Sequence, residues 1–142
     1  MIDFSWALPV LLTALIGSII YRKHKDKEIF NDTAVKFRDE FANELTIIKS
    51  RKQGDTPEAD QILSAAFQKH AAAVERFRPF LSPKDIPAFN KTWNEYHKDE
   101  DGNDAWYQYA EECTGLHDKY PHEPHLMAIE RIENLLKLAR QK

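Results

Sequence analysis

Hydrophobic and polar residues are distributed very unevenly along this chain. Residues 4–21, FSWALPVLLTALIGSIIY, carry no charge, and the basic segment RKHKDK follows at once. After residue 28 the apolar residues instead recur every three or four positions, which is the spacing of amphipathic α-helices. The pattern therefore predicts two parts, an apolar N-terminal segment and a helical domain after it.

The apolar segment has the length and the flanks of a membrane-spanning helix. As an α-helix, residues 4–21 would extend roughly 27 Å, close to the hydrocarbon thickness of about 30 Å. Aromatic rings stand near both ends, where they favour the headgroup region. The residues that we expect in contact with lipid are Phe4, Trp6, Leu11, Leu12, Leu15, Ile16, Ile19, Ile20 and Tyr21.

Two alternatives to an anchor are a cleaved secretory signal and a helix buried in a globular domain. A secretory signal needs basic residues before the apolar run and small residues at a cleavage site after it. Here the basic residues come afterwards, and the bulky residues Ile19, Ile20 and Tyr21 close the run. The favoured interpretation is an uncleaved transmembrane anchor with a basic flank, together covering residues 1–28.

The basic residues give the expected orientation of that anchor. Arg22, Lys23, Lys25 and Lys27 follow the apolar run, and none precedes it. The positive-inside rule then places the N-terminus outside and residues 29–142 in the cytoplasm. The single cysteine allows no intrachain disulfide, which is consistent with a reducing compartment. The lipid bilayer is the first partner that this reading implies.

The first amphipathic segment after the basic flank extends to about residue 52. It begins either at a cap formed by Asn31, Asp32 or Thr33, or as a continuation of the apolar segment. Its residues at spacings of three and four make one apolar stripe. The stripe consists of Ala34, Phe37, Phe41, Leu45 and Ile48.

Four further segments have helical spacing. They cover about residues 57–78, 88–97, 106–116 and 124–139, and loops rich in Gly, Pro or acidic residues separate them. No stretch shows the two-residue alternation of strands, so the fold class is all-α. We expect residues 29–142 to form one bundle of four or five helices.

Composition and motifs argue against several classes of function. The net charge is −3 and no basic field covers the chain, so nucleic acid is not an expected partner. Arg76 and Arg78 flank an aromatic residue, but two arginines are too few for such an interface. The sequence contains no P-loop, dinucleotide-binding fingerprint or G-x-S-x-G motif. We therefore expect no cofactor and do not favour an enzyme.

Three stretches carry a resemblance to other proteins. They are FRDEFANEL (37–45), HAAAVERFRPFLSPKDIPAFNKTWNEYH (70–97) and AIERIENLLKLAR (128–140). Together they resemble an uncharacterised family of short bacterial helical proteins, some with an N-terminal hydrophobic segment. The resemblance implies a bacterial source, hence the inner (plasma) membrane for the anchor, and one intact domain. It implies no activity, cofactor or catalytic residue.

The strongest candidate for metal chemistry is a histidine cluster near the C-terminus. His117, His122 and His125 lie within nine residues, with acidic residues between them. Imidazoles and carboxylates could fill a metal's coordination shell. However, Pro121 and Pro124 break any helix that would place the histidines on one face. A polar loop and a weak metal site both remain as interpretations.

Other candidate residues have weaker signals. The segment DEDGND at 99–104 alternates oxygen ligands, but Asp104 and Ala110 occupy the positions where a calcium loop needs Gly and Glu. His70 lies on an apolar stripe, which favours a core or boundary histidine with one satisfied hydrogen bond over a pH-sensitive contact. Cys113 shares a face with apolar residues and is expected to be an inert buried thiol.

The leading functional hypothesis is a single-pass membrane protein whose cytoplasmic helical domain acts as a protein-interaction or scaffold module. The protein partner is unknown. The alternative is a membrane-tethered enzyme or metal-binding module that uses the histidine loop. Small residues at Thr13 and Gly17, and at Ala14 and Ser18, would let two anchors approach closely, which suggests a homodimer through the anchor.

Overall fold

The computed structural model describes residues 7–52, 54–110 and 123–140. In these ranges the chain forms four α-helices: α1 (Ala7–Ser50), α2 (Ala59–Phe77), α3 (Ile86–His97) and α4 (Pro124–Lys137). Two short 3-10 helices, η1 (Arg78–Phe80) and η2 (Trp106–Tyr109), follow α2 and α3. The prediction of an all-α bundle is confirmed.

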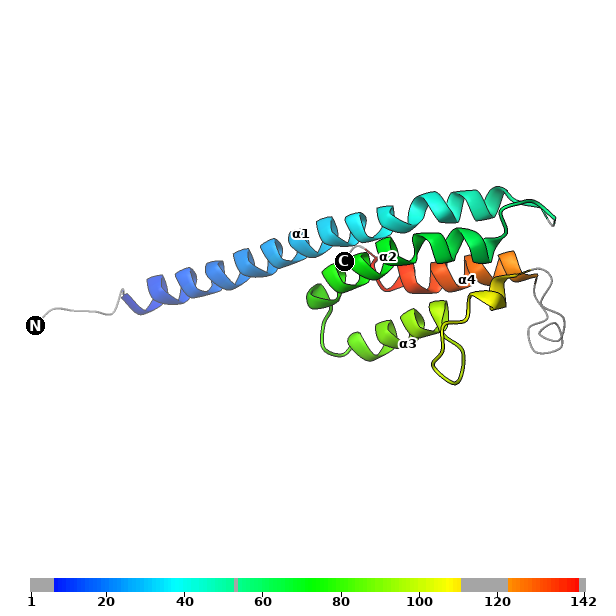
Figure 1. Cartoon of the computed structure of the whole chain (residues 1–142). Helices are drawn as coiled ribbons and strands as arrows, with labels where there is room; N and C mark the ends of the chain where they lie inside the picture. Colours follow the sequence, from blue (N-terminus) through cyan, green and yellow to red (C-terminus); the bar gives the residue numbers. More distant parts are fainter. Residues whose placement is uncertain (1–6, 53, 111–122, 141–142) are drawn as a thin grey trace, which may run out of the picture.

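The helices alternate in direction, so that each runs antiparallel to the one before it (Figure 1). α1 packs against α2 and α4, and α3 packs against α4. The N-terminal half of α1 extends past the ends of the other helices (Figure 1), and its residues 11–29 are exposed. Of the two starts considered for the first amphipathic segment, the continuous helix is therefore the one that forms.

The bundle ends at Phe30 because of the charges that precede it. Phe30 is buried and its ring lies 5.8 Å from that of Phe77, at the end of α2. One and two turns earlier, the positions on the same helical face are Lys27 and Lys23, and both are exposed. Burying a lysine without a partner is costly, so α1 leaves the bundle at this point.

The membrane anchor is a wrong prediction. Within the residues that the structure describes, no helix is both long enough and apolar enough to cross a membrane. The uncharged part of α1 that is described extends only from Ala7 to Tyr21, roughly 22 Å against a hydrocarbon core of about 30 Å. Arg22 and Lys23 follow it directly. The single-pass topology and the inner-membrane location, with its cytoplasmic domain, are corrected on the same ground.

The residues assigned to that anchor have a different setting in the structure. They are exposed side chains of the projecting half of α1, apart from two that lie outside the described residues, Phe4 and Trp6. The exposed residues are Leu11, Leu12, Leu15, Ile16, Ile19, Ile20 and Tyr21. The basic residues Arg22, Lys23, Lys25 and Lys27 are also exposed, one or two turns before the bundle begins.

Aromatic rings fill the core between the four helices. The rings of Phe37 and Phe77 stack at 4.7 Å between α1 and α2, and Phe41 stacks on His70 at 4.0 Å. Offset and tilted ring pairs add to the free energy of plain apolar burial. The largest fully buried side chains are Tyr96, Tyr109, Phe41, Phe77, Phe89, Ile48, Leu63, Ile132, Leu135, His70 and Val74.

The helix boundaries follow the sequence signals with two differences. Pro87 lies inside the first turn of α3, so the helix begins at Ile86 rather than near Ala88; a first-turn proline forfeits no helical hydrogen bond. The helix predicted over 106–116 is not found in its described part. There η2 ends at Tyr109, because Ala110 adopts an extended backbone, and residues 111–116 lie outside the described residues.

We expect the Phe41→Ala variant to lose about 3–5 kcal/mol of unfolding free energy, because it opens a cavity among fully buried rings. The matched change Ile16→Ala, on the exposed half of the same helix, should alter stability by less than about 0.5 kcal/mol. Urea unfolding followed by circular dichroism measures both. Equal losses for the two variants would contradict the separation of α1 into a packed half and an exposed half.

Candidate functional site

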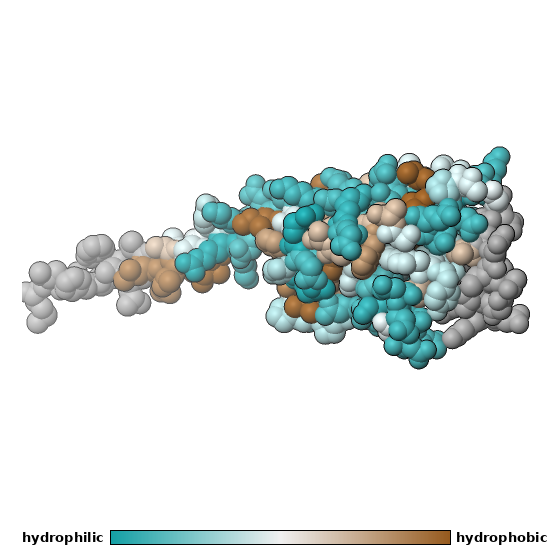
Figure 2. Space-filling model, viewed as in Figure 1, coloured by the Kyte–Doolittle hydropathy of each residue, from teal (hydrophilic) through white to brown (hydrophobic). Residues whose placement is uncertain are grey.

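The projecting half of α1 exposes an unusual amount of apolar surface. From Leu11 to Tyr21, every large apolar side chain is more than half exposed, and Leu11 reaches 62%. We name residues 11–21 the arm. Figure 2 shows it as a largely brown, hydrophobic segment that extends away from a mostly polar bundle surface. Contiguous apolar patches on a chain in water mark surfaces that bind something else.

Four of the large aliphatic residues of the arm share one face of the helix. Leu12 precedes Phe30, and Ile19 precedes Phe37, by about five full turns at 3.6 residues per turn. The same spacing relates Ile16 to the buried Ala34. The face of α1 that packs into the bundle is thus repeated on the arm. We name Leu12, Leu15, Ile16 and Ile19 the aliphatic stripe.

A cluster of positive charge separates the aliphatic stripe from the bundle. It consists of Arg22, Lys23, Lys25 and Lys27, all of them exposed, and we name it the basic collar. Asp26 and Glu28 lie among these residues, so the collar as a whole retains two positive charges in excess. These exposed charges keep this part of α1 hydrated. They also favour acidic over basic surfaces next to it.

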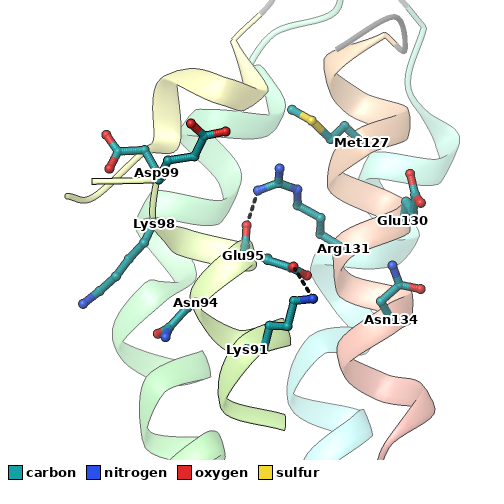
Figure 3. Close-up of a pocket in the computed structure, with 10 residues that line it drawn as sticks. Lys91, Asn94, Glu95, Lys98, Asp99, Met127, Glu130, Arg131 and Asn134 are labelled. Atoms are coloured by element: carbon teal, nitrogen blue, oxygen red, sulfur yellow. Dashed lines mark hydrogen bonds and ion pairs between the residues drawn. The ribbon is translucent and has the colours of Figure 1, made fainter. Parts of the chain in front are cut away.

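A cleft of about 790 Å³ opens between α3 and α4. Figure 3 shows Arg131 reaching across it toward the backbone of Glu95, and Arg131 Nη1 also donates to Gln108 Oε1 at 2.7 Å. Lys91 and Glu95 pair along α3 at 3.9 Å. Acidic and basic side chains alternate around the cleft and compensate one another, so its lining favours no single class of ligand.

A chain of polar groups crosses the core between α1, α2 and α3. Lys69 Nζ lies 2.8 Å from both carboxylate oxygens of Glu44. Glu44 Oε2 lies 3.2 Å from His70 Nε2, and His70 Nδ1 lies 2.7 Å from the Tyr96 hydroxyl. The partners fit one neutral tautomer, in which Nε2–H donates to Glu44 and Nδ1 accepts from Tyr96. We name Lys69, Glu44, His70 and Tyr96 the buried polar chain.

The same chain continues to the C-terminal elements. The Tyr109 hydroxyl donates to the backbone carbonyl of Tyr96 at 2.6 Å. Gln108 from η2 lies beside that carbonyl and accepts from Arg131 of α4. Polar contacts therefore connect all four helices through the interior, and the prediction that His70 is a hydrogen-bonded core histidine is confirmed.

The environment fixes the charge of each group in the buried polar chain. For Glu44, burial alone would raise the pKa, but hydrogen bonds, above all that of Lys69, outweigh burial and lower the pKa to about 2. Burial lowers the pKa of His70 despite the adjacent Glu44, so the imidazole stays neutral. Burial also raises the pKa of Tyr96, whose hydroxyl therefore remains a donor.

The order carboxylate, imidazole, hydroxyl resembles the relay of a hydrolase. A relay acts only where substrate reaches the terminal hydroxyl, and here His70 and Tyr96 are completely buried. Neither His70 nor Tyr96 lines the cleft between α3 and α4, the cleft between α1 and α2, or the cleft between α1 and α4. The buried polar chain is thus a structural device, and the arm is the stronger candidate for contact with other molecules.

The histidine loop, a weak metal candidate, and the acidic loop, which fails the calcium pattern, have different settings in the structure. His117 and His122 lie outside the described residues, as does Cys113; His125 lies in the first turn of α4, with Nε2 3.3 Å from Glu123 Oε2. Among the residues described, no group of three or more His, Cys, Asp or Glu side chains is placed to hold a metal ion. In the acidic loop, the Asp99 carboxylate accepts bonds from two backbone N–H groups and the Tyr107 hydroxyl.

Comparisons with known proteins found no matching family model, no matching curated protein and no matching solved structure. The resemblance to short bacterial helical proteins therefore stays a prediction. Sequence spacing located the apolar residues of the arm, but the partners of Glu44 could not be read from it, because Lys69 and His70 belong to another helix, α2.

We expect the free energy of unfolding to fall as the pH is lowered from 7. His70 is neutral in the folded protein, whereas the unfolded chain binds a proton below about pH 6.5, so stability declines below that value. Glu44 adds a second loss: its stabilising charge is present above about pH 4.5 and is lost as the pH falls toward 2. Urea unfolding at a series of pH values measures both.

The Glu44→Gln variant tests the second of these losses. It should cost about 1–3 kcal/mol at pH 7 and flatten the pH dependence below 4.5, because the variant side chain no longer titrates. Glu40→Gln is the matched control, one turn earlier on α1, since Glu40 pairs with Arg76 at the surface. A pH profile left unchanged by Glu44→Gln would contradict the assigned role of Glu44.

Proposed function

We propose that this protein is an interaction module, in which the helical bundle presents the apolar arm of α1 to a partner protein. The observation that carries the proposal is the exposure of every large apolar side chain from Leu11 to Tyr21. Each square ångström of apolar surface removed from water contributes about 25 cal/mol. A partner that covered several of these side chains would gain substantial binding free energy.

The construction of the arm supports this function. The arm belongs to the same helix as the buried residues Phe30 to Ile48, so its helical form is supported by the bundle. A preformed helix loses less conformational entropy on binding than a segment that must fold first. Helices with apolar side chains at spacings of three and four bind to grooves on other helical proteins.

Among the described residues, no observation favours the alternative function, an enzyme or metal-binding module built on the histidine loop. His117 and His122 lie outside the described residues, and His125 is paired with Glu123 at the start of α4. The cleft between α3 and α4 carries compensating charges rather than a reactive group beside a receptive space. We therefore advance protein interaction alone.

Photo-crosslinking from inside the cell tests the proposal. A benzoylphenylalanine placed at Leu15 on the arm should yield discrete crosslinked protein adducts, since a binding partner would lie within reach. The same probe at Lys91, on the exposed face of α3, is the matched control and should yield far fewer. Identical adduct patterns from the two positions, or no adduct from Leu15, would refute the proposed function.

A further inference from the structure

We propose that the partner of the arm is a second copy of this chain, bound antiparallel through the aliphatic stripe. The inference rests on the proposed function and names the partner. It starts from the continuity of α1, whose bundle-facing side continues onto the arm as Leu12, Leu15, Ile16 and Ile19. Inside the bundle this side of α1 is covered by other helices, whereas on the arm its side chains are more than half exposed.

The pattern of residues limits how far a covering helix can extend. Toward the bundle, the next positions on this side of α1 are Lys23 and Lys27, which are exposed. Toward the bundle, an apolar partner can therefore cover this side of the arm no further than Ile20. A segment of the same length with the same pattern exists on the second copy, so one patch can serve both subunits, as in a two-fold symmetric interface.

An antiparallel register brings large apolar residues together. When Leu12 of one copy lies opposite Leu15 of the other, symmetry places Leu15 of the first opposite Leu12 of the second. The small residues Ala14, Gly17 and Ser18 lie on the opposite side of the helix. The interface therefore differs from the close approach through small residues that the sequence suggested.

Charge selects this orientation over the parallel one. In a parallel pair the two basic collars would lie side by side at an interaxial distance of 8–10 Å, and like charges at that distance repel. In the antiparallel register each basic collar lies beyond Ala7, the first described helical residue of the other copy. The bundles do not collide, because about 15 Å of helix separates Ile20 from Phe30.

The expected affinity follows from the size of the contact. Two helices that pair over three to four turns bury on the order of 1,000 Å² in total, at the small end of specific interfaces. Contacts of this size form reversible complexes. We therefore expect a dimer that forms and dissociates in the micromolar range, and that presents the two bundles at opposite ends of the paired arms.

Analytical ultracentrifugation of the full chain, from about 1 to 200 µM, tests for this dimer. The variant Leu12→Asn/Leu15→Asn should raise the dissociation constant by at least about a hundred-fold, because it removes both leucine pairs. Gly17→Asn is the matched control, since it adds the same polar side chain where Gly17 has open space, and it should leave dimerisation unchanged. Dissociation by Gly17→Asn alone would overturn the proposed face.

Disulfide trapping tests the orientation in a Cys113→Ser background. Mixed Ile19→Cys and Leu8→Cys proteins should form a disulfide between the two different chains, because the antiparallel register sets these positions opposite each other. Ile19→Cys alone should not crosslink, since its two copies would be about 16 Å apart along the axis. Crosslinking of Ile19→Cys to itself would instead indicate a parallel pair and overturn the orientation.

The two proposals fail in different ways. A chain that remains monomeric at every concentration, yet is crosslinked from Leu15 to a different protein in the cell, overturns the second copy as partner and leaves the interaction module standing. A chain that is monomeric and yields no adduct from Leu15 overturns both. An adduct with the mass of two chains, lost in Leu12→Asn and retained in Gly17→Asn, supports both.

Discussion

A neutral imidazole holds the interior of this bundle in register. His70 can donate to Glu44 and accept from Tyr96 at the same time only while it carries a single proton. The two contacts join three helices, and Tyr96 passes the connection on to Tyr109 through its carbonyl oxygen. Apolar packing alone tolerates small sliding of one helix against another. Directional bonds at the centre of the core fix which turn of each helix faces which.

Nearby side chains offset the free-energy cost of burying these polar groups. Glu44 would be unfavourable in an apolar core, but it lies at the edge of the bundle, where partly exposed Lys69 reaches both of its oxygens. Phe41 stacks on the imidazole from the adjacent turn of α1 and shields it from water. The polar and aromatic contacts thus depend on each other: rings exclude solvent from the bonds, and the bonds satisfy groups that the rings bury.

Periodicity in the sequence predicted much of the fold, because the stripe from Ala34 to Ile48 and the start signals before α3 act locally. Two features could not be predicted in this way. The uncharged N-terminal run suggested lipid, whereas no helix within the described residues is long and apolar enough to cross a membrane. The buried polar chain escaped detection because Glu44 and Tyr96 look like surface and core residues of separate helices. Only the folded arrangement brings their side chains within bonding distance.

Because α1 continues without a break through the basic collar, the arm and the bundle are joined by one helix. The direction in which the apolar face of the arm points is fixed relative to the bundle, because successive residues of an α-helix are rotated by about 100°. Inserting or deleting one residue in the basic collar would rotate the exposed leucines about the helix axis by a quarter turn or more. It would not disturb any side chain packed in the bundle. Inserting or deleting seven residues would nearly restore the direction in which the leucines face, and it would change their distance from the bundle. Changes in the length of the basic collar would therefore alter the geometry of any assembly with little effect on folding.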